Sequence, residues 1–199
     1  MNAARDVFLR QGFDGARMQE IADRAGINKA MLHYYFRSKN QLFDVVFTET
    51  LGMFHQIFRE ILLSDRPFVE KLRMMIERDI DVLMEHPDIP LFVVTEVARN
   101  PEQMGERARG THLAGLIEEF SRQVRSAVRK KQIRRVDPLD LLMNLLSLNR
   151  FPFVAGPMLR SLAGVEEKKF QTLMKRRKKT VADLLVGDLT RNLPGDQNS

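Results

Sequence analysis

Apolar residues recur at three- and four-residue intervals along almost the whole chain, the spacing of helices that bury one face. No stretch alternates apolar and polar residues in the manner of a half-buried strand. We therefore expect an all-α protein. The predicted helices cover 3–11, 18–25, a third segment from 28, then 39–63, 67–85, 89–98, 111–131, 139–149 and 166–189.

Three of these helices begin at recognisable capping sequences. Asn28 has the side chain of an effective N-cap, and 38–41 reads S-x-x-Q, the form of a capping box. The pair Asp137-Pro138 combines a capping aspartate with proline at the first helical position. These signals fix the starts of the third, fourth and eighth predicted helices.

Glycine and proline predict where helices end. Gly12 is expected to end the first helix. Asn100-Pro101 is expected to end the helix predicted over 89–98. Pro152 and Gly156-Pro157 are expected to interrupt the helix that begins at 139. That helix is apolar nearly all round, so we expect it to be buried on more than one side.

The segment from Gly12 to Lys39 has the spacing of a helix-turn-helix. Ala22 and Gly26 lie four residues apart, so a small residue allows close helix approach and a glycine can close the first helix in the left-handed conformation. The apolar contacts of a three-helix unit would come from Ile21, Ala25, Ile27, Leu32 and Tyr35. A helix-turn-helix places its second helix, here the one predicted from 28, in the major groove of DNA.

This segment resembles the N-terminal domain of the tetracycline-repressor (TetR) family. The resemblance is carried by Gly12-Phe13, Met18 to Ala22, Ala25 to Lys29, Leu32, Tyr35-Phe36, Ser38-Lys39 and Leu42. It implies an N-terminal three-helix domain over 1–45 and a helical ligand-binding and dimerisation domain over 46–190. It also implies a homodimeric repressor that binds palindromic operator DNA and is released by a small ligand. Residues 191–199 are expected to be a disordered tail.

The resemblance assigns the third helix to the major groove, with further contacts from its neighbours. Lys29 can donate to guanine or phosphate, Ala30 and Met31 suit a thymine methyl, and Gln19 could read adenine. Lys39, beside a helix N-terminus, would clamp a phosphate. The full set of expected DNA contacts is Arg17, Gln19, Asn28, Lys29, Ala30, Met31, His33, Tyr34 and Lys39.

Three features depart from the family pattern. Arg17 stands where a capping threonine is usual, and it could reach a phosphate instead. His33 replaces a usual tyrosine but can still donate to a phosphate. The chain also begins almost inside its first helix, without the short basic lead-in common in the family. This suggests a truncated start or an alternative initiation site, and either would weaken nonspecific affinity.

The second domain offers two expectations. The apolar helix after Pro138 and the stripe of 166–189 fit a four-helix interface with a second subunit, although both could simply close the core of one chain. The 13 Phe and 11 Met residues suit a pocket for a small, largely apolar or amphipathic effector, and equally an ordinary helical core. The candidate pocket residues are Phe54, Phe58, Phe92, Phe120, Met143 and Phe151.

Composition narrows the class further. The chain has 199 residues and no cysteine, which excludes disulfides and thiolate chemistry. A net charge of +6 fits a polyanionic partner, but much of the surplus lies in 122–135 and 175–179, which we interpret as solvated helix faces. With no signal peptide and charged residues interrupting 139–162, we expect a cytoplasmic protein with no membrane contact.

Two other functions are alternatives to a DNA-binding regulator. An enzyme is disfavoured because no nucleophile elbow, zinc-binding H-E-x-x-H, phosphate loop or dinucleotide fingerprint occurs. His55, His86 and Glu96 could meet as a metal or ligand contact, although isolated structural histidines explain them as well, and we expect no metal or cofactor. The second rival is a small-molecule-binding helical protein whose helix-turn-helix is a structural remnant.

Overall fold

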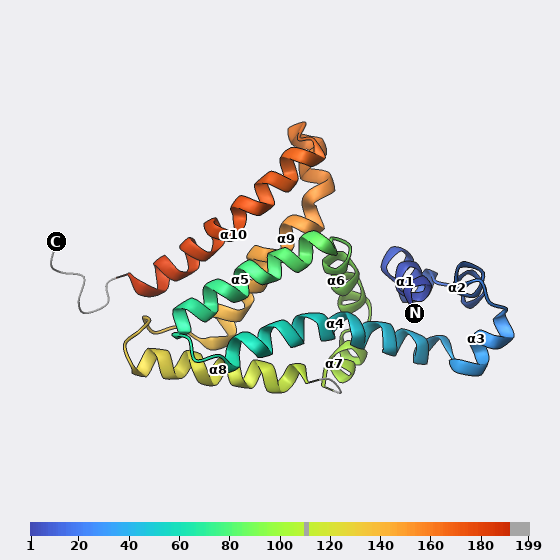
Figure 1. Cartoon of the computed structure of the whole chain (residues 1–199), viewed down its shortest axis with the longest axis horizontal. Coiled ribbons are helices and arrows are strands. Elements are labelled where there is room, and N and C mark those ends of the chain that lie inside the picture. The colour runs from blue at the N-terminus through green and yellow to red at the C-terminus, as the bar shows by residue number, and fades with distance from the viewer. Residues whose placement is uncertain (110–111, 192–199) are drawn as a thin grey trace. The chain divides into compact units, whose positions relative to one another are not determined.

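A computed structural model describes residues 1–109 and 112–191 (Figure 1). Within these residues the fold is all-α, as predicted, with ten helices. The expected tail lies outside the described residues from 192 onward. The helices are α1 (Asn2–Gly15), α2 (Met18–Ala25), α3 (Lys29–Tyr35), α4 (Lys39–Leu63), α5 (Phe68–Glu85), α6 (Ile89–Arg99), α7 (Pro101–Arg109), α8 (Leu113–Arg129), α9 (Pro138–Ala163) and α10 (Glu167–Thr190).

The described chain forms two compact units. One contains residues 1–53, 88–109 and 112, and the other contains residues 54–87 and 113–191. The boundary therefore falls inside α4, between Met53 and Phe54, and α6 and α7 belong to the N-terminal unit. The compact units are defined by packing within the chain. The domain boundary expected after residue 45 is a different kind of boundary, and it stays a prediction.

The N-terminal unit has one apolar core that combines the first four helices with α6 and α7. Phe43 is fully buried and packs edge-on against Phe8, with ring centroids 5.1 Å apart. Phe92 of α6 lies 5.7 Å from the same ring, and Met104 of α7 is buried in the same cluster. Burying aromatic side chains of this size contributes roughly 1.5–3 kcal/mol each. The helix-turn-helix is thus stabilised by helices distant in sequence.

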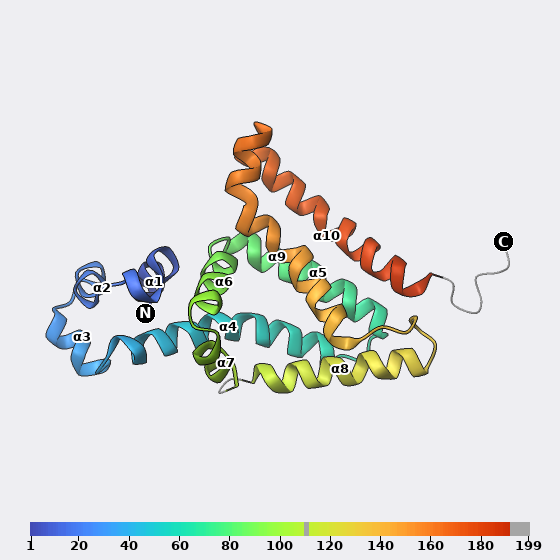
Figure 2. The same cartoon turned by 180° about the vertical axis from the view of Figure 1, so that it is seen from behind.

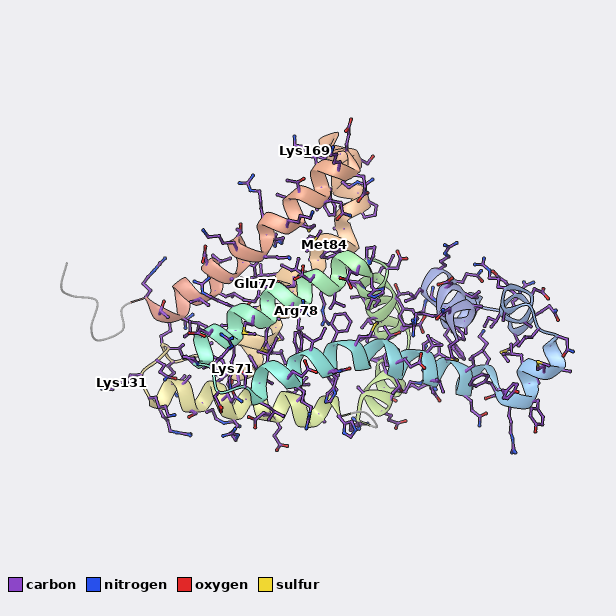
Figure 3. All side chains as sticks on the ribbon, in the orientation of Figure 1. Lys71, Glu77, Arg78, Met84, Lys131 and Lys169 are labelled. Atoms are coloured by element: carbon purple, nitrogen blue, oxygen red, sulfur yellow. The ribbon has the colours of Figure 1, made fainter. Side chains whose placement is uncertain are left out.

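The second unit is built around α5, which packs against α10, α9 and α8 (Figure 2). Its core includes Ile76, Ile80, Phe120, Leu145 and Val181, all at most 1% exposed. A buried lysine contacts the C-terminal end of α4, which belongs to this unit. Lys71 of α5, labelled in Figure 3, donates at 2.7 Å to the carbonyl of Leu62, which the helical pattern leaves free in the last turn of α4.

One predicted helix end is wrong, and one helix is missing from the prediction. Gly12 kinks α1 at φ 69° and ψ −178°, but the helix resumes and runs to Gly15. Asn100-Pro101 does end α6, yet Pro101 also begins α7, which the sequence analysis missed. Proline favours the first position of a helix because its missing N–H has no partner there, so the same dipeptide serves both functions.

The predicted interruption of α9 is also wrong, since α9 runs unbroken from Pro138 to Ala163 through Pro152 and Pro157. A proline inside a helix leaves the carbonyl four residues earlier without its N–H donor. For Pro152 that carbonyl belongs to Leu148, and the guanidinium of Arg177 donates to it at 3.0 Å and 3.3 Å. A side chain from α10 thus replaces the lost helical bond.

No helix within residues 1–109 and 112–191 combines the length and apolar character needed to cross a membrane. The apolar segment 139–162 lies in α9, which packs against α5, α8 and α10.

Candidate nucleic-acid interface and effector region

The turn between α2 and α3 has the geometry that the sequence predicts. Ala22 is fully buried, and Gly26 adopts φ 68° and ψ 26°, the left-handed conformation. The N–H groups of Gly26 and Ile27 donate back to the last turn of α2, and the latter bond reaches the Ala22 carbonyl at 3.1 Å. This closes α2 and sets the direction of the following helix.

Asn28 caps α3 as predicted, because its side-chain oxygen accepts the N–H of Met31 at 2.7 Å. Ser38 likewise accepts the N–H of Gln41 at the start of α4. Gln41 completes a variant of the capping box, since its side chain accepts the N–H of Arg37. The starts of both α3 and α4 are thus fixed by residues close to them in the sequence.

α3 buries only Leu32, and every other residue of this seven-residue helix is exposed. The exposed fraction is 82% for Tyr34 and 46% for Met31. Large apolar and aromatic side chains gathered on an exposed helix indicate a surface that meets a partner. The predicted contacts Lys29, Ala30 and His33 lie on the same helix and are exposed as well.

The prediction that Tyr35 belongs to the core is wrong. Tyr35 is 68% exposed, and its ring lies edge-on to Tyr34 with centroids 5.4 Å apart. Ala25, also expected in the core, is exposed. The last turn of α3 has only Leu32 and the half-buried Phe36 to face the core, so Tyr35 falls on the solvent side. Tyr35 is therefore a candidate contact that the sequence analysis missed.

The contacts expected outside α3 also lie at the surface. Arg17 occupies the N-cap of α2 in an extended conformation and makes no side-chain cap bond, which agrees with the view that it cannot replace a capping threonine. Gln19 is exposed and donates to Asp23 at 2.7 Å. Lys39 is half-buried, because its ammonium group donates to the carbonyl of Asp14 at 3.2 Å and lies 4.6 Å from the Phe13 ring centre.

The structure does not bring the six candidate effector residues together. Phe58 and Phe120 share the core of the second unit, and Phe54 is buried in the same unit. Phe92 instead belongs to the core of the N-terminal unit. Met143 and Phe151 are 53% and 61% exposed on α9. An apolar side chain in the sequence could not reveal which of these environments it would occupy.

A buried polar cluster lies in the second unit, and the sequence analysis missed it. Asp79 of α5 accepts from Asn149 at 2.9 Å and from Arg150 at 3.3 Å. Asp79 and Asn149 are at most 1% exposed, and the Arg150 guanidinium lies 5.0 Å from the ring centre of Phe54. Two buried atoms of this cluster, the side-chain oxygen of Asn149 and Nε of Arg150, have no hydrogen-bond partner among residues 1–109 and 112–191. Buried polar groups are seldom left unpaired, so this pair indicates a place for a further polar partner.

The suggested meeting of His55, His86 and Glu96 has no support as a metal site. Among residues 1–109 and 112–191, no group of three or more His, Cys, Asp or Glu side chains is placed to hold a metal ion. Glu96 instead is fully buried and accepts the backbone N–H of Phe13 at 2.9 Å.

Exposed apolar residues are concentrated on α9 and α10. Leu162 is 77% exposed, and several others exceed 50%. These residues are Leu139, Met143, Phe151, Met158, Leu173 and Leu184. Exposed apolar side chains gathered on two helices of one unit are typical of a face that a second protein covers.

The capped turn, the left-handed Gly26 and the exposed α3 define a helix-turn-helix DNA-binding protein. The family model described as bacterial regulatory proteins, tetR family, matches residues 1–46, and a tetracyclin repressor-like C-terminal domain matches 69–184. Since the latter alone covers more than half of the chain, the protein belongs to the TetR family of transcriptional regulators.

Individual proteins resemble this chain in sequence or in fold. The chain is 28% identical to the HTH-type transcriptional regulator RutR of Escherichia coli over 168 residues, which covers 82% of this chain and 76% of RutR. Among solved structures, FadR of Bacillus subtilis in complex with stearoyl-CoA has a TM-score of 0.72 at 17% identity, covering 94% of this chain and 96% of FadR. AibR in complex with isovaleryl coenzyme A and operator DNA has a TM-score of 0.65 at 18% identity, with 94% of each chain covered.

Proposed function

We propose that the protein is a homodimeric repressor that binds a palindromic operator and is released by a small, largely apolar or amphipathic effector in the cytoplasm. The observation that carries the DNA-binding part is the exposure of α3. This short helix buries Leu32 alone and presents Lys29, Met31, His33 and Tyr34 to solvent, with Tyr35 beside them. A helix that only stabilised the fold would bury more of its aromatic surface.

Different contacts should carry affinity and sequence preference. Lys29, Ala30, Met31, His33 and Tyr34, with Gln19, would face base edges or the adjoining phosphates. Arg17, Asn28 and Lys39 stand at helix starts, where free backbone N–H groups favour phosphate. A single three-helix unit reads few base pairs, so a second copy related by twofold symmetry would supply the specificity.

The exposed apolar residues of α9 and α10 support dimerisation through these helices. They belong to one unit, and the two helices pack on each other. Met143 and Phe151 are then expected to contribute to this face, and not to the effector pocket.

We place the effector in the second unit, among Phe54, Phe58 and Phe120. The unpartnered atoms of Asn149 and Arg150 beside Phe54 suit an effector with both a hydrogen-bond donor and an acceptor on an otherwise apolar body. Because FadR and AibR were solved with acyl-CoA molecules, acyl-CoA thioesters are the first compounds to test.

The DNA-binding part is tested with two variants of the full chain. Lys39→Ala should weaken binding to every duplex and lower the slope of log affinity against log salt by about one unit for each half-site. Lys29→Ala should instead change sequence preference, at about 1–3 kcal/mol per base contact. Unchanged salt slope and sequence preference in both variants would favour the alternative, in which the helix-turn-helix is a remnant of a small-molecule-binding protein.

The effector part is tested by reciprocity. An acyl-CoA that weakens operator binding must itself bind less tightly, by the same factor, when operator is present. Equal acyl-CoA affinities with and without operator would exclude release by that compound.

A further inference from the structure

The last turn of α1 connects α6 to Lys39 through hydrogen bonds and an ion pair within one compact unit. Gly12 breaks the helical conformation, so residues 12–15 form a turn whose first N–H groups lack the usual intrahelical acceptors. The carboxylate of Glu96 accepts the N–H of Phe13 at 2.9 Å. Arg99, one turn further along α6, lies 3.9 Å from the carboxylate of Asp14. Two charged residues of α6 therefore hold this turn.

The same turn holds Lys39 at the start of α4. The carbonyl of Asp14 accepts from the Lys39 ammonium group, and the Phe13 ring lies beneath it. Phe13 also packs edge-on against Phe43, with ring centroids 5.1 Å apart, so the ring itself is fixed in the core. Lys39 thus takes its position from two residues that Glu96 and Arg99 restrain.

The fit at Gly12 is close enough to make Glu96 part of this arrangement. A side chain at position 12 would place its first carbon 2.8 Å from the bound oxygen of Glu96 and 3.0 Å from Arg99. The buried carboxylate can approach this backbone only because residue 12 is glycine. A carboxylate at the start of a helical turn is also favoured by the aligned N–H dipoles.

We infer that Glu96 is a positioning residue for the phosphate contact of Lys39, although it lies outside the helix-turn-helix. The inference rests on the proposed function, in which Lys39 binds a DNA phosphate. Glu96 acts through the N–H of Phe13, and the turn 12–15 carries the effect to the Lys39 ammonium group. Loss of the carboxylate lets the turn and Lys39 shift together, so the phosphate contact weakens while α3 keeps its base contacts.

The test measures binding of the full chain to a duplex of arbitrary sequence over a range of salt concentrations. Glu96→Ala should lower the salt slope by about one unit for each half-site, the same change as Lys39→Ala. The double variant should show no further decrease. Glu96→Gln keeps an acceptor without the charge, so it should fold and show a smaller change in the same direction. Glu102→Gln, an exposed carboxylate of α7, is the matched control and should leave the slope unchanged.

The outcomes separate the two proposals. If Lys39→Ala itself leaves the salt slope unchanged, the phosphate contact in the proposed function is wrong. If Lys39→Ala lowers the slope but both Glu96 variants keep it, Glu96 has only a structural role and the inference is overturned. A Lys39→Ala effect of full size in the Glu96→Ala background would overturn it as well, because the two residues would then act independently.

Discussion

Arg177 should stabilise the protein only as long as residue 152 is proline. Pro152 deprives the Leu148 carbonyl of its helical donor, and two nitrogens of Arg177 replace that donor. Burial lowers the pKa of Arg177, because the charged guanidinium is partly removed from water at this position. An acceptor without a partner costs about 1–3 kcal/mol. Part of this cost is offset in the variant, because the folded protein no longer has to remove a guanidinium from water. We expect Arg177→Met to lower the free energy of unfolding by about 1–2 kcal/mol.

The dependence on Pro152 provides the decisive comparison. In a Pro152→Ala background, the restored backbone N–H can bond the Leu148 carbonyl, so Arg177→Met should cost little. The four proteins form a double-mutant cycle, measured by urea unfolding with circular dichroism at one fixed protein concentration. Arg176→Met, an exposed neighbour, is the control and should be near neutral. Equal costs of Arg177→Met in both backgrounds, within about 0.5 kcal/mol, would refute this account of α9.

The remaining predictions concern the kink, the acid response and the dimer. Gly12→Ala should destabilise the protein by about 4 kcal/mol, from backbone strain and loss of the Glu96 bond. Gly26 is also at positive φ, but beyond its chain neighbours no atom of the described residues lies within 4 Å of an added carbon, so Gly26→Ala should cost only about 1–2 kcal/mol. Similar losses for the two glycines in urea unfolding would contradict the close contact at Gly12. Hydrogen bonds from Arg122 and then Gln123 lower the pKa of Glu119 below its usual 4.5, so its carboxylate stabilises the fold above that pH, and the contribution is lost as the pH falls through the lowered pKa. The stability difference between the wild type and Glu119→Gln should therefore be constant near neutral pH and shrink below about pH 4.5; a difference that grows in acid would show that the sign is wrong. Leu184→Glu should convert a dimer to monomers in light scattering at micromolar concentration, whereas Leu63→Glu, at the same exposed fraction of 58%, should not. A wild-type monomer, or equal dissociation by both variants, would remove α9 and α10 as the interface.

The parts of the interface that the sequence predicted depend on neighbours a few residues away. Ala22 and Gly26 close one helix, Asn28 caps the next, and Ser38 starts α4. Each device acts within about five residues, so spacing along the chain was enough to reveal it. The prediction that Tyr35 belongs to the core is wrong because Leu32 alone anchors the seven-residue α3. Such a short helix can expose two adjacent aromatic residues to solvent.

The features that the sequence could not reveal depend on residues far apart in the chain. Glu96 and Phe13 are separated by 83 positions, and Asp79 and Asn149 by 70. α9 continues through Pro152 because of Arg177, which lies on another helix. The same limit applies to the six candidate effector residues, since an apolar side chain suits a core, a pocket or a subunit interface equally well. Only tertiary packing separates Phe92 from Phe120 or exposes Phe151.

The most direct test of the central claim is selection of duplexes from a random pool by the purified full chain. The account predicts enrichment of a palindromic or nearly palindromic site, because two α3 helices related by twofold symmetry would read equivalent half-sites. Repeating the selection with Lys29→Ala or Tyr34→Ala should change the preferred bases, while Lys39→Ala should weaken recovery without changing them. Failure of the wild-type protein to enrich any sequence would contradict the account and support a helix-turn-helix retained only as a structural remnant.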